Sequence, residues 1–288
     1  MSEDFDASLR LREEHAAVPQ TEEIIATMNA IAQAVSIEQV WQSLVGILSR
    51  IGFDLVNYGY ASDVSRFRRG NIGGGFYLST WPRPLTRSYF EGGLYARTPM
   101  FRWATLNQGV CSWGWSYEER RAGRLSDDEC RALDEISRLG LRAGITISFV
   151  PTSSRGKAAM GLGAPRYMDH EDVDSLWACV GDKVMALCNM AHLRLIQMPL
   201  PSGAEPLTGR QREILEWVAD GKTMQDISLL TRLSQSAVEK HLRNIRERLQ
   251  VETTAQAVAR ASFLNQLFVP DGAESPALAR PAGATKSD

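Results

Sequence analysis

The chain has 288 residues, a net charge of −2 and a hydrophobic fraction of 44%. This length suits two domains, and the charge excludes a uniformly basic nucleic-acid-coating protein, although not a local basic patch. No apolar run reaches the roughly 18 residues that a transmembrane helix needs. The acidic N-terminus, MSEDFDASLRLREEHAA, lacks the apolar stretch of a signal peptide. We therefore expect a cytoplasmic protein that does not bind membranes.

The chemistry-bearing residues do not form a catalytic or metal-binding pattern. The four cysteines and four histidines are dispersed and form no CxxC pair, so we expect no metal site. The sequence has no GxSxG, P-loop, HExxH or dinucleotide-binding fingerprint. We therefore expect neither an enzyme nor a bound cofactor.

Hydrophobic periodicity predicts the elements in chain order. Residues 1–20 are charged and are expected to form a mobile arm. Helices are expected from Thr21 and, behind a capping box of Ser36 and Gln39, up to Gly52. The remaining elements are strands at 53–61 and 76–80, helical pieces at 85–92 and 99–106, a helix after Ser126, strands at 144–150 and 157–163, and a helix at 169–196. The glycine run 71–75 and the segment PTSSRG are interpreted as turns.

This order favours an α+β fold: an N-terminal α-β-α sandwich around an antiparallel sheet, because the strands come in adjacent pairs. Residues 197–206 hold three prolines and a glycine, which is typical of a linker. Residues 207–269 are helical again. The tail, 270–288, is too polar to bury a core and is expected to be disordered.

Capping signals divide 207–269 into four helices. Thr208 with Gln211 begins the first helix and Gly221 ends it. Thr223 begins a short second helix, and a tight turn leads into a third helix that starts at Ser234. A fourth helix, TTAQAVARASFLNQL, follows. Two short helices joined by a tight turn indicate a helix-turn-helix domain.

Basic residues concentrate on the third helix, which holds four of the nine in this domain. Residues 207–269 contain nine Lys/Arg and seven Asp/Glu, a net charge of +2. Helical spacing places Lys240, Arg243 and Asn244 on one face, opposite an apolar stripe of Val238, Leu242, Ile245 and Leu249. Such a face can enter the major groove of DNA. The candidate DNA-binding residues are Lys222, Thr223, Ser234, Ser236, Glu239, Lys240, Arg243, Asn244 and Arg246.

Two resemblances sharpen this interpretation. The run LTGRQREILEWVADGKTMQDISLLTRLSQSAVEKHLRNIRERLQ closely resembles the LuxR-type helix-turn-helix, with Gln211 in place of the usual glutamate. Residues 22–195 resemble the autoinducer-binding domain of quorum-sensing LuxR-type regulators, in which an acyl-homoserine lactone lies between sheet and helices. Tyr89, Pro99, Trp113 and Gly144 match the conserved tyrosine, proline, second tryptophan and glycine of that family. The resemblance implies domains at 21–196 (sensor domain) and 207–269 (DNA-binding domain).

The polar ligand contacts of that family are replaced. Thr98 stands where an aspartate accepts from the ligand amide, Leu85 where a tryptophan donates to the lactone, and Trp81 where a tyrosine helps to hold the acyl carbonyl. Losing such contacts could weaken lactone binding by roughly 10²–10⁴-fold. The candidate ligand-binding residues are Tyr77, Trp81, Leu85, Tyr89, Thr98, Met100, Phe101, Trp113 and Thr146.

Several hypotheses remain open for the sensor domain. Its large side chains either fill the pocket, so that the protein acts without a ligand, or shape it for a more apolar or aromatic signal. An acyl-homoserine lactone held in a rearranged way is a third possibility. The expected partners are double-stranded DNA and a second copy of the chain. RNA polymerase and a related regulator, bound in an inactive heterodimer, are further candidates.

Overall fold

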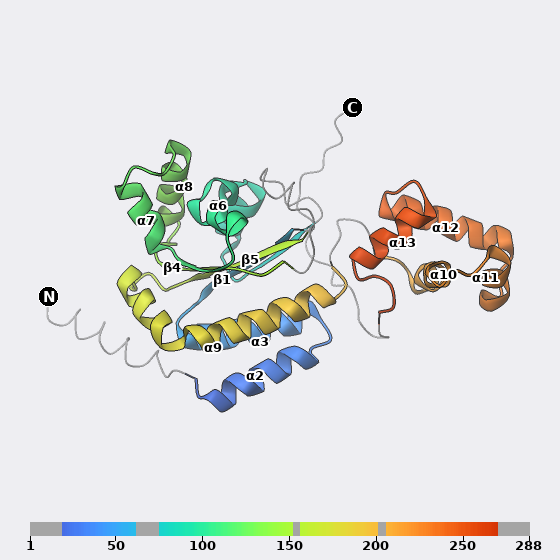
Figure 1. Ribbon diagram of the computed structural model, residues 1–288, viewed down its shortest axis with the longest axis horizontal. Coiled ribbons are helices and arrows are strands. Elements are labelled where there is room, and N and C mark those ends of the chain that lie inside the picture. The colour runs from blue at the N-terminus through green and yellow to red at the C-terminus, as the bar shows by residue number, and fades with distance from the viewer. Residues whose placement is uncertain (1–18, 62–74, 152–155, 201–205, 270–288) are drawn as a thin grey trace. The chain divides into compact units, whose positions relative to one another are not determined.

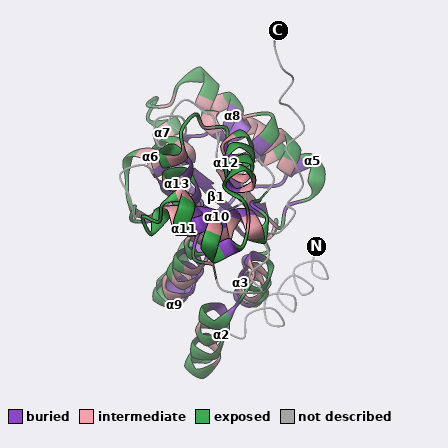
Figure 2. Ribbon diagram, turned by 90° about the vertical axis from the view of Figure 1, so that its right-hand side faces the viewer, coloured by how far each residue is buried: buried purple, intermediate pink, exposed green. Residues whose placement is uncertain are grey.

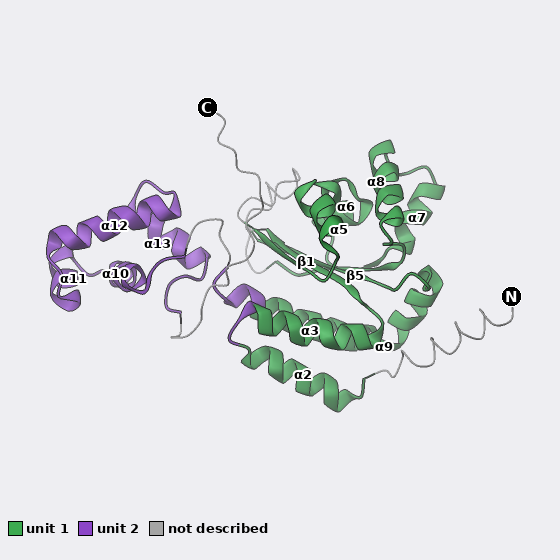
Figure 3. Cartoon of the chain, turned by 180° about the vertical axis from the view of Figure 1, so that it is seen from behind, with its two compact units in different colours: residues 1–34, 38–194 green, residues 35–37, 195–288 purple. Residues whose placement is uncertain are grey.

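The computed structural model describes residues 19–61, 75–151, 156–200 and 206–269, which form two compact units. The first unit contains 38–194 together with the residues before 35, and the second contains 195–288 together with 35–37 (Figure 3). The expected arm, the turns at 71–74 and 152–155, the centre of the expected linker and the tail fall on residues outside the described ranges.

A five-stranded antiparallel sheet organises the described part of the first unit. Its strand order is β2 (Phe76–Ser79), β1 (Leu55–Ala61), β5 (Lys157–Gly163), β4 (Gly144–Ser148) and β3 (Gly109–Ser112). The sequence predicted the antiparallel sheet and four of these strands. It missed β3, because a four-residue strand with a glycine and a serine carries almost no alternation.

Helices cover both faces of the sheet (Figure 1). On one face lie α9 (His170–Gln197) and α3 (Ile37–Ile51), with α2 (Thr21–Gln33) beyond them. On the other face lie α6 (Pro99–Leu106), α7 (Gly114–Arg121) and α8 (Asp127–Arg138). The predicted α-β-α sandwich is confirmed, whereas α7 was missed because its sequence, GWSYEERR, has little apolar periodicity.

The connection from β2 to α6 is made of short helical pieces. They are α5 (Arg83–Thr86), a single π-helical turn η1 (Arg87–Glu91) and a 3₁₀ turn η2 (Leu94–Arg97). Gly93, with φ of 70°, adopts the left-handed conformation that lets the chain turn between the last two. This connection brings several aromatic side chains onto the sheet.

The alternation of side chains along β1 separates the two layers. Tyr58 points toward α9, where its hydroxyl lies 3.0 Å from Nδ1 of His192. Asn57 and Gly59 point to the opposite face. The strands and the inward sides of the helices are buried, while the outer helical surfaces are exposed (Figure 2).

The second unit contains four helices in its described part: α10 (Gly209–Ala219), α11 (Met224–Thr231), α12 (Gln235–Leu249) and α13 (Thr254–Phe263). The predicted capping box of Thr208 and Gln211 is present. The start of the expected linker is structured, because α9 continues to Gln197 and the Leu200 N–H donates to the carbonyl of Leu264 at 2.9 Å.

Candidate DNA-binding surface and sensor cavity

The third helix of the C-terminal unit, α12, is amphipathic, as its sequence predicts. Its apolar stripe of Val238, Leu242, Ile245 and Leu249 is buried against the neighbouring helices. Burial of this stripe leaves the opposite face exposed, with the side chains of Glu239, Lys240, Arg243 and Asn244. Packing therefore orients the polar residues of α12 outward as one surface.

The charged groups of this surface have no protein partners in the described part of the chain. Neither Lys240 nor Arg243 forms a hydrogen bond or salt bridge with any described residue. Arg246 differs, because its Nη1 donates to Oγ1 of Thr254 at 3.0 Å and its side chain is half-buried. Lys240 and Arg243 are thus the free cations, whereas Arg246 also links α12 to α13.

The hydroxyl groups predicted to bind phosphate also cap helices. Thr223 accepts from the N–H of Asp226 and donates to its carboxylate at 2.6 Å, which completes the cap of α11. Ser234 accepts from the N–H of Ala237 and lies 3.0 Å from the hydroxyl of Ser236. Lys222 is exposed immediately before α11. These four residues lie at the starts of α11 and α12. Their binding to DNA phosphates stays a prediction.

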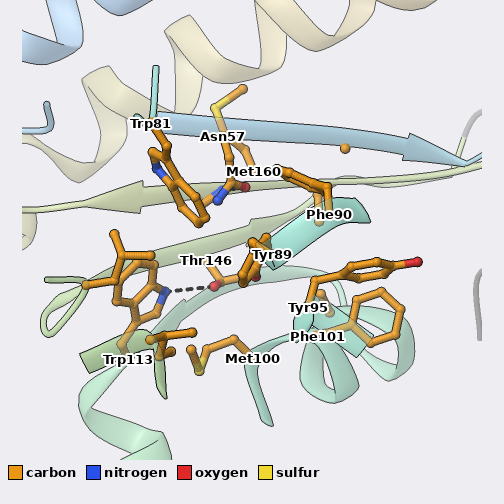
Figure 4. Close-up of a pocket in the computed structure, with 16 residues that line it drawn as sticks. Asn57, Trp81, Tyr89, Phe90, Tyr95, Met100, Phe101, Trp113, Thr146 and Met160 are labelled. Carbon is orange, nitrogen blue, oxygen red and sulfur yellow. Dashed lines mark hydrogen bonds between the residues drawn. The ribbon is translucent and has the colours of Figure 1, made fainter. Parts of the chain in front are cut away.

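The first unit contains a cavity of about 60 Å³ between the sheet and α6. Trp81 and Trp113 lie on one side of it, and Tyr95 and Phe101 on the other (Figure 4). The complete lining is Asn57, Gly59, Trp81, Tyr89, Phe90, Tyr95, Met100, Phe101, Ala104, Trp113, Ile136, Leu141, Thr146, Ala159, Met160 and Gly161.

On the sheet side, which forms the floor of the cavity, space is left because small residues lie opposite each other on adjacent strands. In the register of β1 and β5, Asn57 lies opposite Gly161 and Gly59 lies opposite Ala159. The amide of Asn57 occupies the space above Gly161, since a β-carbon there would lie 3.0 Å from Asn57 Nδ2. Any larger residue at 161 would therefore displace this amide.

The polar groups of the cavity are mostly satisfied within the protein. The indole N–H of Trp113 donates to Oγ1 of Thr146 at 2.9 Å (Figure 4). The amide oxygen of Asn57 accepts from the N–H of Gly161 at 3.2 Å. The indole N–H of Trp81 is buried and finds no partner among the described residues. Burial raises the pKa of the Tyr89 phenol to about 12, although a hydrogen bond with Thr98 opposes this shift.

Aromatic contacts fill much of the space around these groups. Trp81 meets Tyr89 edge-on, with ring centroids 4.8 Å apart, and Tyr95 meets Phe101 in the same way at 5.0 Å. Each such pair contributes about 0.5–1.5 kcal/mol beyond its buried area. A connected set of aromatic rings therefore lines one part of the cavity.

Six of the predicted ligand-binding residues line this cavity: Trp81, Tyr89, Met100, Phe101, Trp113 and Thr146. The other three do not. Tyr77 stacks on Phe90 at 4.2 Å, and Leu85 is packed in the core beside the cavity. Thr98 is buried at the start of α6, where its hydroxyl donates to the carbonyl of Tyr95 and accepts from the N–H of Phe101.

Sequence reasoning missed the floor of the cavity. The polar residue Asn57, inside the apolar strand sequence LVNYGYA, was the sequence signal that could have identified it.

Two further findings concern possible cofactors and membranes. No cluster of histidine, cysteine and carboxylate side chains suited to a metal ion occurs among the described residues. No helix in the described ranges is long and apolar enough to span a bilayer.

Comparisons with known proteins agree with this arrangement of two units. The family model described as "Autoinducer binding domain" matches residues 36–195, which is more than half of the chain. The model described as "Bacterial regulatory proteins, luxR family" matches residues 205–261. Residues 196–204 lie between the two matches.

Individual relatives span most of the chain. The transcriptional activator protein SolR of Ralstonia nicotianae is 24% identical over 231 residues, which cover 77% of this chain and 89% of SolR. The transcriptional activator protein LuxR of Aliivibrio fischeri is 21% identical over 193 residues, covering 67% of this chain and 75% of LuxR. A crystal structure of Escherichia coli SdiA matches with a TM-score of 0.50 and 17% identity, covering 85% and 98% of the two chains, which indicates a shared fold.

Proposed function

Because the chain belongs to the LuxR-type quorum-sensing transcriptional regulators, we propose that it binds DNA as a homodimer and reaches this state without an acyl-homoserine lactone. The family and the relatives named above are transcriptional regulators, not enzymes. As a DNA-binding regulator, the protein is placed by this proposal in the bacterial cytoplasm.

The exposed surface of α12 supports the first part of the proposal. Lys240 and Arg243 are one helical turn apart, exposed and free of partners among the described residues. In this docking, α12 enters the major groove, Arg243 and Lys240 meet bases or phosphates, and Glu239 selects a cytosine amino group. A dimer would present two such helices to half-sites about one turn of DNA apart.

The internal hydrogen bonds of the sensor domain support the second part, and they are the observation that carries it. Trp113 already donates to Thr146, Thr98 already caps α6, and Leu85 has no donor. The remaining cavity, about 60 Å³, is far below the roughly 300–1,000 Å³ of typical small-molecule sites. A domain satisfied in this way does not need a lactone to complete its core.

A second candidate function is regulation by a different small molecule. The buried indole N–H of Trp81 favours it, because a donor without an acceptor costs about 1–3 kcal/mol that a ligand could recover. In this case the ligand would adjust the activity of a protein that is already folded.

The test combines native mass spectrometry with DNA binding, on protein purified from a host that makes no acyl-homoserine lactones. We expect a dimer without added mass that shifts the anisotropy of labelled DNA selected from a random-sequence pool. A monomeric or aggregated product that an added lactone rescues would contradict lactone independence. A folded protein that binds DNA only together with a related regulator, or not at all, would favour the heterodimer hypothesis instead.

A further inference from the structure

The sensor cavity has no charged lining residue. Its walls are aromatic or aliphatic, and its polar lining groups are neutral: the amide of Asn57, the hydroxyls of Thr146, Tyr89 and Tyr95, and the indole N–H groups of Trp81 and Trp113. An ion inside this cavity would lose its hydration without gaining a counter-charge, which is strongly unfavourable. Any ligand that binds here is therefore neutral.

Two donors of the cavity, one of them fully buried, have no acceptor in the described part of the chain. Trp81 is 6% exposed, and its Nε1 has no partner there. Asn57 is 8% exposed, and its Oδ1 is held by the Gly161 N–H, which leaves Nδ2 to face other groups. The Asn57 Nδ2 donates no hydrogen bond within those ranges. This orientation of the amide follows from Gly161, because a backbone N–H needs an oxygen opposite it.

The hydroxyl oxygens of Thr146, which lines the cavity, and of Thr98, which lies at the start of α6, each accept one hydrogen bond within the protein. Oγ1 of Thr146 accepts from Trp113, and Oγ1 of Thr98 accepts from the Phe101 N–H. A ligand amide N–H would thus compete for oxygens that the protein already uses. The cavity therefore offers free donors in Trp81 and Asn57, while its threonine hydroxyl already accepts a hydrogen bond.

We propose that this cavity binds a small neutral molecule with an aromatic or cyclic body and a carbonyl group, as in a ketone, aldehyde or ester, whose oxygen accepts from Trp81 and Asn57. The ring occupies the aromatic part of the cavity, and no group of the ligand has to donate. This inference deepens the second candidate function, since it names the chemical class of the signal.

Phe101 controls the size of the ligand that can enter. The present volume of about 60 Å³ is smaller than the roughly 150 Å³ of a cavity that holds benzene. Phe101 lines the cavity and also an open hollow on the other side, beside Arg102 and Ser126. Because its half-buried side chain borders both spaces, we expect rotation of Phe101 to enlarge the cavity.

The test uses two probes of the same shape, acetophenone and α-methylstyrene, which differ only in C=O against C=CH₂. Calorimetric titration of the full-length protein gives the dissociation constants, and ¹H–¹⁵N spectra report the Trp81 indole. We expect acetophenone to bind at least fivefold more tightly and to shift the Trp81 N–H resonance. In a cavity without available donors the hydrocarbon would bind equally or more tightly, and that result would overturn the proposal, as would binding of neither probe.

Substitutions of the two donors test whether they bind the carbonyl oxygen of the ligand. Asn57→Leu and Trp81→Phe should each weaken acetophenone binding about fivefold, the value of one net hydrogen bond, without weakening α-methylstyrene binding. Tyr77→Phe lies outside the cavity and should change neither. If Asn57→Leu does not fold, Trp81→Phe and the comparison of the two probes on the wild-type protein still test whether the cavity binds a carbonyl. DNA binding measured without any added compound tests the proposed function separately, so the two can fail independently.

Discussion

His192 lies on the face of the sheet opposite the cavity, stacked on Phe149 with ring centroids 4.2 Å apart. Its Nδ1 is 3.0 Å from the hydroxyl of Tyr58, and its buried Nε2 has no partner among the described residues. A second proton on this ring would therefore have no acceptor. Burial lowers the pKa of His192 from 6.5 to about 4.

This pKa predicts how stability depends on pH. Below pH 6.5 the unfolded chain takes up a proton at His192, whereas the folded protein stays neutral there until about pH 4. The free energy of unfolding should therefore fall by roughly 2 kcal/mol from pH 6.5 to pH 5 through this residue, at about 1.4 kcal/mol per unit. Urea titrations at both pH values measure the loss.

The control separates this histidine from the other groups that titrate. His192→Gln should remove this part of the pH dependence, while Tyr58→Phe, which keeps the imidazole, should retain it. An unchanged slope in His192→Gln would show that His192 is not the buried neutral base described above.

Gly144 gives a second prediction at the level of single residues. A β-carbon there would lie 2.4 Å from the carbonyl oxygen of Leu162 and 2.9 Å from the ring of Trp113. Because the backbone oxygen cannot move aside cheaply, Gly144→Ala should lower the free energy of unfolding by about 3 kcal/mol. Gly59→Ala, with no atom within 4 Å of its new carbon, should change it by less than about 1 kcal/mol. Similar losses in both variants would contradict this account.

At the scale of elements, α12 differs from α8 in whether its charged side chains form salt bridges. On α8, Asp128, Glu129 and Asp134 are each paired with an arginine. On α12, Lys240 and Arg243 are unpaired within the described ranges. Their charges are therefore available to an external polyanion.

Substitutions on α12 test this difference. Arg243→Ala should weaken binding to a selected DNA site by about 1–3 kcal/mol if Arg243 reads a base. Lys240→Ala should weaken binding to all sequences and lower the slope of log K against log salt by about 1 if Lys240 meets a phosphate. Fluorescence anisotropy across a salt series measures both effects. Arg131→Ala, on α8, serves as the control, and unchanged affinity of Arg243→Ala would rule out this docking.

The helices and caps of the C-terminal unit could be predicted because their signals are local: a capping residue, an apolar stripe and a closing glycine. The cavity could be predicted only in part. Its walls contain residues that the family resemblance picked out, such as Trp113 and Tyr89. Its floor depends on the strand register that brings Asn57 to Gly161, and register is set by contacts between residues 104 positions apart in the sequence.

At the scale of the whole molecule, the C-terminal unit begins before the predicted linker ends. Met198 and Leu200 are buried, and the side-chain amide of Asn265 donates to the carbonyls of Ile196 and Met198. Proline content indicated an exposed connection here, because composition does not reveal that Leu200 pairs with Leu264. Residues 195–200 therefore contribute to the stability of this unit.

Two fragments test this boundary. A fragment of residues 195–269 should be more stable than one of 206–269 by about 2 kcal/mol, because it retains two buried apolar side chains and their hydrogen bonds. Urea unfolding followed by circular dichroism compares them. Asn265→Ala should lower the stability of the longer fragment and leave the shorter one nearly unchanged. Equal midpoints for the two fragments would instead support a linker that starts at 197.

The helix cap at Thr98 affects how easily this protein could evolve toward lactone recognition. An aspartate at position 98 could still accept from the Phe101 N–H and would restore the carboxylate that the family resemblance associates with the ligand amide. It could not donate to the Tyr95 carbonyl as Thr98 does, and it would bury a charge that only a ligand amide would partner. Position 98 is thus one substitution from the carboxylate of the family pattern, at the cost of a hydrogen bond to Tyr95. Leu85 and Trp81 are different, because both are packed into the core and a change of size there would require compensating changes nearby. Burial therefore limits a change toward lactone recognition at all three positions.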